Sequence, residues 1–204
     1  MQNTAASSTI ADEFARQGYA VLPALLAPDT AGLLWTYVQT KLGTHLMPVG
    51  DAQVPGTPNS YGDPMTEGLL AHLCPRLEAL LGRRLFPTYS YMRLYKTGDA
   101  LARHRDRAAC EISLSVNAGQ VPDAPWALHI EGADGPRAVD LAPGDAVVYR
   151  GIERTHWRDA YAGESLLQIF LHYVDADGPH AAEKFDRRPA LMIRPVKRTI
   201  PGKV

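Results

Sequence analysis

The chain has 204 residues, of which 46% are hydrophobic and 21% are charged, and these proportions are ordinary for a soluble globular protein. The formal net charge of −1 provides no basic surface for nucleic acid or for an anionic membrane, so we expect neither as a partner. The length favours a single domain over residues 1–204, because domains usually have about 100–200 residues.

Helices dominate the first part of the chain, residues 1–84. A helix is expected to begin at Thr9, with acidic residues in its first turn, and to end at Gly18. A strand over 19–22 follows. Pro28 then opens a second helix, whose apolar residues recur at helical spacing.

The segment 43–64 is rich in Gly, Pro, Asn and Asp and shows no hydrophobic periodicity. Long irregular segments inside compact domains are more often functional than idle. Two interpretations stay open, a lid over the mouth of a pocket and an ordinary surface loop. Two short helices are expected after it, at 65–72 and 75–81.

From Leu85 the hydrophobic pattern changes to that of strands. Turn signals such as Gly98-Asp99 and Pro143-Gly144-Asp145 separate many short apolar runs, a pattern that indicates a sandwich or jelly roll. The helices precede the strands instead of alternating with them, which disfavours a parallel α/β sheet. We predict a mainly β protein with helical support and a loop over 1–84, a β core over 85–175 and a tail over 176–204. Strands are expected near 85–96, 102–106, 110–118, 126–131, 137–141, 145–150, 154–158 and 165–174.

Within these strands, His104-Arg105-Asp106 carries the strongest chemical signal. Two residues apart on an extended strand, His104 and Asp106 point to the same face. An imidazole nitrogen and a carboxylate oxygen provide two of the three ligands of a facial site for non-haem Fe(II). His156 is the best candidate for the third ligand, because the intervening strands can return the chain to the same end. The alternative is that His156 is a hydrogen-bonded strand histidine and Asp106 a turn cap.

Two other histidines, His129 and His172, lie on predicted strands and could face the same pocket. Their ordinary interpretation is as structural or surface histidines. Arg105 and Arg107 flank Asp106 and should face away from a metal. They would either steer an anionic substrate or pair with acidic residues, for which the candidates are Glu111 and Asp99.

A longer pattern surrounds the triplet: Tyr95-x-x-Gly98-x-x-Leu101-x-x-His104-x-Asp106, then Gly144-Asp145 at the start of a strand, then His156. This pattern resembles the 2-oxoglutarate- and Fe(II)-dependent dioxygenases, especially their prolyl-hydroxylase-like branch, over roughly 13–174. The resemblance implies a double-stranded β-helix, which is a jelly-roll, cupin-like fold. It also implies Fe(II), 2-oxoglutarate and O2 as cofactors, with hydroxylation of a small molecule or a peptide side chain.

The resemblance further implies a cation for the far carboxylate of 2-oxoglutarate, since an unpaired buried carboxylate is costly. Members of that branch place Arg or Lys roughly nine or ten residues after the distal histidine, where this chain has Ser165 and Leu166. Either the cation comes from elsewhere or the cosubstrate differs. We expect Tyr95 with Arg93 to bind this carboxylate, with Arg150 and Arg158 in reserve and a hydroxyl from Ser165.

Two alternatives stay open, and the missing late Arg or Lys supports the first of them. One is a cupin-like Fe(II) oxygenase that does not use 2-oxoglutarate, and the other is a non-catalytic metal-binding jelly-roll module. Neither Cys74 nor Cys110 belongs to a CxxC pair, and no signal peptide or apolar run of about 18 residues is evident. We expect a reducing, cytoplasmic setting. The sequence indicates no oligomeric state.

Overall fold

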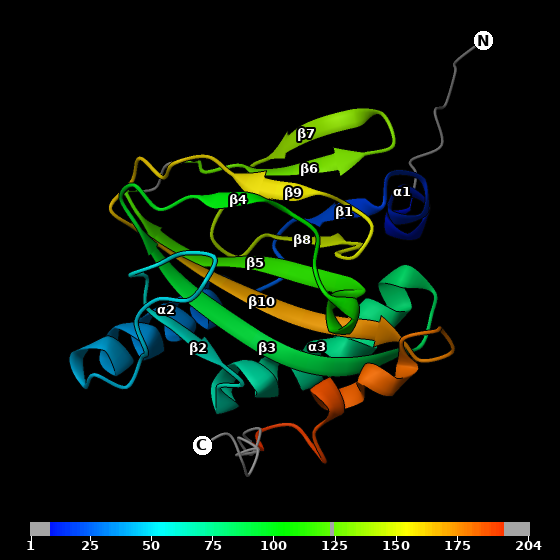
Figure 1. The fold of residues 1–204 in the computed structure, drawn as a ribbon, viewed down its shortest axis with the longest axis horizontal. Coiled ribbons are helices and arrows are strands. Elements are labelled where there is room, and N and C mark those ends of the chain that lie inside the picture. Colours follow the sequence, from blue (N-terminus) through cyan, green and yellow to red (C-terminus); the bar gives the residue numbers. More distant parts are fainter. Residues whose placement is uncertain (1–8, 123–124, 194–204) are drawn as a thin grey trace, which may run out of the picture.

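The computed structural model describes residues 9–122 and 125–193 (Figure 1). Helices and short strands occupy the first part of the chain, and a series of strands follows, as the sequence predicts. The first group is α1 (Ile10–Gln17), β1 (Tyr19–Leu22), α2 (Pro28–Gly43), β2 (Asn59–Tyr61) and α3 (Pro64–Leu81). The second group is β3 (Leu85–Lys96), β4 (Leu101–His104), the 3-10 helix η1 (Ala108–Cys110), β5 (Ile112–Val121), β6 (Leu128–Gly132), β7 (Gly135–Val139), β8 (Ala146–Tyr149), β9 (His156–Arg158), β10 (Ser165–Asp175) and the 3-10 helix η2 (Ala181–Arg187).

Helix α1 begins and ends where its sequence signals lie. The side chain of Thr9 accepts a hydrogen bond from the backbone of Asp12, and the Asp12 carboxylate accepts one from the backbone of Thr9, which forms a capping box. Gly18 ends the helix in the left-handed conformation, with φ of 79°, a geometry that glycine adopts without strain.

The predicted break between helices at 65–72 and 75–81 is wrong, because α3 is one helix with Pro75 inside it. A proline in a helix interior costs about 3 kcal/mol. Burial of a leucine side chain contributes about 1.5–3 kcal/mol, and the leucines before and after Pro75 face the same core, so their packing outweighs the break. These buried leucines are Leu70, Leu73, Leu77 and Leu81.

The strands form two antiparallel sheets. The larger sheet has the order β1-β8-β5-β10-β3-β2 and the smaller has the order β4-β9-β6-β7. The smaller sheet lies over one face of the larger one, while α2 and α3 pack against the opposite face (Figure 1). The chain therefore has the double-stranded β-helix fold with N-terminal helices, as expected.

Strand β5 shows how the larger sheet separates an apolar face from a polar one. Ile112, Leu114 and Val116 belong to the core that contains the helices. The alternate residues, Ser113 and Ser115 among them, are buried as well, and they face the space between the two sheets because side chains alternate along a strand. Polar groups in that space are the setting of the functional site.

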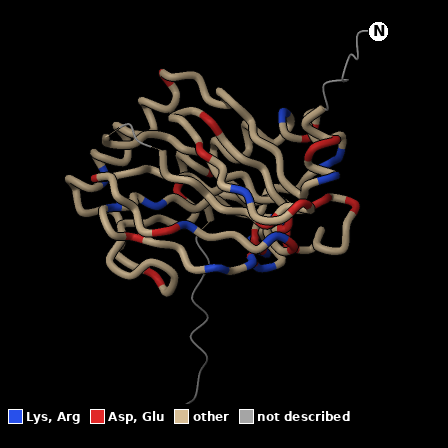
Figure 2. The backbone as a smooth tube through the Cα atoms, turned by 90° about the horizontal axis from the view of Figure 1, so that it is seen from above, with Lys and Arg blue, Asp and Glu red and all other residues tan. Residues whose placement is uncertain are grey.

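Part of the expected tail packs against the β core. Arg188, just after η2, is buried and pairs with Glu67 of α3. The remainder of the tail, 194–204, lies outside the described residues. Basic and acidic positions are interspersed along the backbone (Figure 2), in keeping with the net charge of −1. None of the helices within 9–122 and 125–193 is long and apolar enough to cross a membrane.

Candidate metal centre

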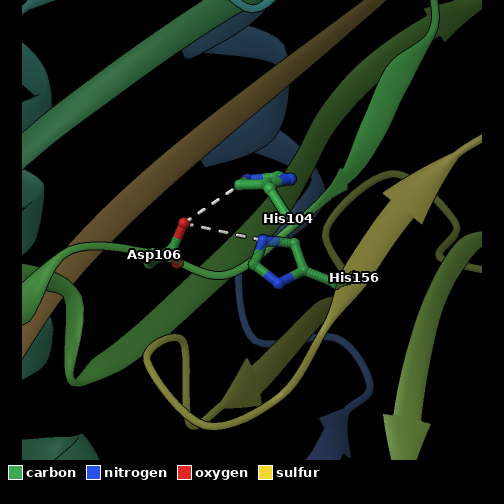
Figure 3. A group of neighbouring side chains, drawn as sticks. All are labelled: His104, Asp106 and His156. Carbon is green, nitrogen blue, oxygen red and sulfur yellow. Dashed lines mark ion pairs between the residues drawn. The ribbon is translucent and has the colours of Figure 1, made fainter.

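His104, Asp106 and His156 meet between the two sheets, and the Asp106 carboxylate points toward both imidazole rings (Figure 3). His104 ends β4 and His156 begins β9, and the two residues are directly paired in register. Asp106 lies beyond β4, where its backbone N–H donates to the carbonyl of Gly151 at 2.9 Å. The predicted strand over 102–106 thus ends earlier, and a backbone bond to a loop helps to place the carboxylate.

The distances within this triad suit a shared ion. Nε2 of His104 lies 3.5 Å from Oδ1 of Asp106, and Nε2 of His156 lies 3.6 Å from the same oxygen. Both separations exceed the usual N–H···O hydrogen-bond range of about 2.7–3.2 Å. Ligand atoms that each lie about 2.1 Å from one ion are at most about 4.2 Å apart. The three atoms are therefore spaced as ligands that could hold one ion.

The opposite nitrogen of each imidazole is held by the backbone. Nδ1 of His104 lies 2.9 Å from the carbonyl oxygen of Ala102, and Nδ1 of His156 lies 3.0 Å from that of Arg154. A carbonyl only accepts hydrogen bonds, so Nδ1 carries the proton and Nε2 keeps its lone pair. Both rings are thus in the tautomer that a metal requires. In each case the acceptor belongs to the residue two positions before the histidine.

The electrostatic environment favours the metal-binding protonation state at Asp106 and His156 and opposes it at His104. Burial alone would raise the pKa of Asp106, but the neighbouring imidazoles of His104, His156 and His172 lower it overall. Burial lowers the pKa of His156. Burial acts in the same direction on His104, but Asp106 and the Ala102 carbonyl outweigh it and raise the pKa of that ring.

The second carboxylate oxygen of Asp106 is also held. The hydroxyl of Ser113 donates to Oδ2 at 3.1 Å, and Nδ1 of His172 lies 2.9 Å from the same hydroxyl oxygen. When the single hydroxyl hydrogen goes to the carboxylate, His172 must donate to Ser113. Burial lowers the pKa of His172 to about 4, which keeps this ring neutral. Ser113 was not predicted as a site residue, although polar residues alternating in the apolar run ISLSVN are a signal of a polar interior.

A cavity of about 420 Å³ adjoins the triad. Its lining residues include four aromatic side chains and three arginines. The segment 43–64 contributes part of the wall through Asp51 and Gln53, so this part of it is more than an ordinary surface loop. The aromatic residues are Tyr89, Tyr91, Tyr149 and Phe170, and the arginines are Arg93, Arg105 and Arg107.

Arg93 is buried on β3 and already has a carboxylate partner. One of its terminal nitrogens pairs with Asp51, which also accepts a hydrogen bond from the hydroxyl of Tyr91 at 2.5 Å. The other terminal nitrogen donates to the hydroxyl oxygen of Tyr95 at 3.0 Å. Tyr95 therefore acts as an acceptor toward Arg93 and keeps its own hydrogen for another partner.

Arg158 is a buried cation without a carboxylate partner among the described residues. It lies two residues after His156 on the same face of β9, and 3% of it is exposed. Its terminal nitrogens donate to the Gln168 side chain at 3.0 Å and to the Trp126 carbonyl, while its Nε has no partner. Burial lowers the pKa of Arg158. A buried charge with no counterion is costly, so this position favours an anion.

Trp126 connects Arg158 with Tyr95. Its ring lies 4.8 Å from the Tyr95 ring, and the Arg158 guanidinium lies 4.6 Å from the Trp126 ring centre. Gln168, which accepts from Arg158, in turn donates to Ser115 at 2.8 Å. The sequence signal for Arg158 was its two-residue spacing from His156, which places both side chains on one face.

Of the expected anchors, Arg93 lines the cavity, whereas Tyr95, Arg158, Arg150 and Ser165 do not. Arg150 pairs with Glu153 at 3.2 Å and lies over the ring of Phe14 in α1. Ser165 does not line the cavity, and its carbonyl accepts a hydrogen bond from Tyr161.

Of the two interpretations of Arg107, a pair with Glu111 or Asp99 is the one that the structure contradicts. Arg107 pairs with Asp186, through two hydrogen bonds of 2.6 and 2.9 Å. The interaction joins a residue beside the candidate metal ligands to the segment after β10, and no local sequence pattern indicates such a distant partner. The competing histidine His129 pairs with Asp159 and stacks on Trp157, and it does not line the cavity.

No family model and no curated protein matches the sequence. Among solved structures, a prolyl-4-hydroxylase from Pseudomonas putida superposes with a TM-score of 0.66 at 20% identity, over 81% of this chain and 97% of the other. The epimerase SnoN, in complex with Fe3+, alpha ketoglutarate and nogalamycin RO, superposes with a TM-score of 0.69 at 17% identity, over 92% of each chain. HygX from Streptomyces hygroscopicus, with nickel, 2-oxoglutarate and hygromycin B bound, gives a TM-score of 0.64 at 11% identity, over 80% and 85%. These similarities establish a shared fold.

Proposed function

We propose that this chain, which shares the double-stranded β-helix fold of those proteins, is a non-haem Fe(II)- and 2-oxoglutarate-dependent oxygenase that hydroxylates a C–H bond. The observation that carries the proposal is the convergence of two histidine Nε2 atoms on one oxygen of Asp106, at 3.5 and 3.6 Å, beside a cavity. Solved proteins of the same fold with iron or nickel and 2-oxoglutarate bound support the same choice of cofactors.

His104, Asp106 and His156 would hold the ion and leave three adjacent coordination positions open, which suits a bidentate cosubstrate together with O2. Iron and 2-oxoglutarate, when bound, supply the oxygen activation that an unreactive C–H bond requires. The chain's part is to fix the ligands, orient both substrates and exclude water. The backbone acceptors of the two Nδ1 atoms and the Ser113 hydroxyl perform the first of these tasks.

The far carboxylate of 2-oxoglutarate would be bound by Arg158 and by the hydroxyl of Tyr95. Arg158 is buried, its Nε lacks a partner, and Gln168 positions its guanidinium. Arg93 donates to Tyr95, which directs the tyrosine hydrogen toward an acceptor. On this assignment Arg93 positions Tyr95, and Arg158 on β9 takes the role that a residue of the last strand has in the prolyl-hydroxylase-like branch.

The substrate would be a small molecule. A cavity of about 420 Å³ lies within the range of about 300–1,000 Å³ that small-molecule sites occupy. Hydroxylation is the reaction named for the prolyl-4-hydroxylase of the same fold, whereas SnoN is named an epimerase. Mass analysis of the product separates the two outcomes, because hydroxylation adds one oxygen atom.

The test is an anaerobic titration of the protein with Fe(II) and 2-oxoglutarate, followed by visible absorption. A weak charge-transfer band should appear with the native chain and be absent with His104→Ala. His72→Ala is the matched control, because His72 is exposed on α3 and should leave the band unchanged. A native chain that binds Fe(II) but gives no band with 2-oxoglutarate would contradict the proposal.

One alternative has an observation of its own. The cavity-facing side of β10 carries Leu166, Gln168, Phe170 and His172 and no cation, as a cupin-like Fe(II) oxygenase without 2-oxoglutarate would allow. Formation of succinate from 2-oxoglutarate in the presence of Fe(II) and O2 would exclude this alternative. A non-catalytic metal-binding module would bind the ion and consume no 2-oxoglutarate under any condition.

A further inference from the structure

We propose that the substrate is a small organic anion whose carboxylate or phosphate group is bound by Arg105 at the rim of the cavity. This inference rests on the proposed function and extends it to the class of substrate. It follows from which charged side chains around the cavity already have a partner of opposite charge and which do not.

Three arginines line the cavity, and two of them are neutralised. Arg93 pairs with Asp51, and Arg107 pairs with Asp186. Arg105 has no carboxylate partner within 9–122 and 125–193, and its polar contact is one of 3.4 Å from Nε to the hydroxyl of Thr155. A guanidinium carries five N–H donors in a planar fork that matches carboxylate and phosphate. Most of the donors of Arg105 therefore remain available to a ligand.

The acidic partners of the other two arginines, Asp51 and Asp186, offer no comparable place for a cation. Oδ1 of Asp51 accepts from the backbone N–H groups of Gln53 at 2.9 Å and Val54 at 2.8 Å, and Oδ2 accepts from Tyr91 and Arg93. A carboxylate has about four lone-pair sites, so Asp51 is fully used.

The carboxylate oxygens of Asp186 are also occupied by hydrogen bonds. Its carboxylate accepts from both terminal nitrogens of Arg107 and from the hydroxyl of Tyr61. A cationic substrate would have to break these bonds, whereas an anionic substrate meets open donors at Arg105.

The charges of the loaded centre leave Arg105 in excess. A divalent ion with Asp106, and the two carboxylates of 2-oxoglutarate with Arg158, together sum to neutrality. The pairs at Arg93 and Arg107 are neutral as well. One positive charge therefore remains at the rim, on the residue between two metal ligands in sequence. An anion bound there stays next to the centre, and the aromatic walls, Tyr89, Tyr91 and Phe170 among them, suit an apolar body.

The test uses protein loaded with Zn(II) and 2-oxoglutarate, in which no turnover occurs, and ligand-observed NMR with three matched probes. The probes are 3-phenylpropanoate, its primary amide 3-phenylpropanamide, and 2-phenylethyl phosphate. At least one anion should bind about tenfold or more tightly than the amide, since hydrogen bonds to charged groups contribute about 1.5–3 kcal/mol. The stronger of the two anions distinguishes a carboxylate substrate from a phosphate.

Arg105→Gln should remove the preference for the anion, and Arg103→Gln should retain it. Arg103 is the matched control because it lies on β4, two residues before Arg105, pairs with Glu131, stacks on Trp157 and does not line the cavity. The inference is overturned if neither anion binds more tightly than the amide, or if the preference survives Arg105→Gln.

The Fe(II) and 2-oxoglutarate titration, run on the same preparations, separates this inference from the proposed function. A normal absorption band with no preference for anions would overturn the substrate class alone. An absent band would remove the proposed function and, with it, this inference. The band also has to persist when the anion is added, because its loss would mean that the probe displaces 2-oxoglutarate instead of binding at Arg105.

Discussion

At the scale of single residues, Arg158 and Gly151 decide how the candidate centre is built. Arg158 brings a charge into the interior without a carboxylate of the chain to balance it. Gly151 lies against the carboxylate of Asp106, and a Cβ built on it would lie 2.4 Å from Oδ2. Arg158 therefore favours a bound anion, and the missing side chain of Gly151 leaves room for the Asp106 carboxylate. Each gives a separable prediction.

Replacement of Arg158 should weaken the binding of 2-oxoglutarate and leave the metal in place. We expect Arg158→Gln to lower the affinity for 2-oxoglutarate by about tenfold or more, because it removes a charge-assisted hydrogen bond to a carboxylate. Fe(II) affinity should change little. Separate titrations with metal and with 2-oxoglutarate measure the two effects. Arg150→Gln is the control, since Arg150 pairs with Glu153 away from the cavity, and an equal loss in both variants would argue against the anchor.

A methyl group at position 151 should disturb the metal site. Gly151→Ala places a carbon against Oδ2 of Asp106 and against the carbonyl oxygen of Cys110, each at 2.4 Å, so the carboxylate has to move. We expect a loss of Fe(II) affinity, measured by titration with a competing chelator. Gly32→Ala provides the comparison, because nothing lies within 4 Å of that Cβ and alanine favours a helix by about 1 kcal/mol over glycine. Unchanged metal binding in Gly151→Ala would contradict the prediction.

At the scale of elements, the sequence predicted best what local pattern determines. The strand over 85–96 has the predicted bounds, because alternation continues to the turn at Gly98. The predicted strand over 102–106 is too long, since the backbone N–H of Asp106 donates to the carbonyl of Gly151 in a distant loop instead of continuing the strand. The sequence predicts two helices separated before Pro75, but α3 is continuous because tertiary packing outweighs the effect of the proline.

The site shows the same division between local and distant information. The triad was predictable because a two-residue spacing and a family-like pattern both mark it, and His104 and His156 do pair across neighbouring strands. The partners of the arginines were not predictable, because Asp51 and Asp186 come from segments that no periodicity connects to Arg93 or Arg107. Local pattern thus indicates the ligands, and only the folded chain shows which cations remain unpaired.

The segment before β2 depends on the pair of Asp51 with Arg93. Asp51→Asn removes the counterion of a guanidinium whose side chain is 3% exposed, and we expect a loss of about 1–3 kcal/mol in the free energy of unfolding. Amide hydrogen exchange should also accelerate over 49–58. Asp177→Asn is the comparison, because its pair with Arg84 is exposed on both sides and such pairs contribute about 0–1 kcal/mol. Equal exchange rates in the two variants would show that the ion pair does not hold the loop.

At the scale of the whole molecule, a bound ion would join the two sheets. His104 and His156 belong to the smaller sheet, and Asp106 is hydrogen-bonded to Ser113 of the larger one. Binding to the native state alone stabilises a protein by about 2.7 kcal/mol at a hundredfold excess over Kd. For a chain of this size we expect a rise in Tm of roughly 5–11 °C with saturating Mn(II) or Zn(II). A thermal melt measures it, and His104→Ala should abolish it.

The same stabilisation should depend on pH. Both imidazoles have to be neutral to bind metal, and the pKa of His104 is raised above its ordinary value of 6.5, so His104 takes up a proton first as the pH falls. The lowered pKa of His156 keeps that ring neutral at lower pH than the ring of His104. We expect the metal-induced rise in Tm to be full at alkaline pH and to shrink as the pH falls through the raised pKa of His104. A constant rise between pH 8 and pH 5 would contradict this assignment.

The carbonyl groups that hold the two histidine rings belong to Ala102 and Arg154, each two positions before its own histidine. Main-chain oxygens are common to all amino acids, so exchanging the side chains at these positions leaves the acceptors in place. The orientation of both imidazole rings therefore does not depend on which side chains occupy positions 102 and 154. The residues at these two positions can therefore be substituted while the Nε2 lone pairs of both imidazoles keep their direction.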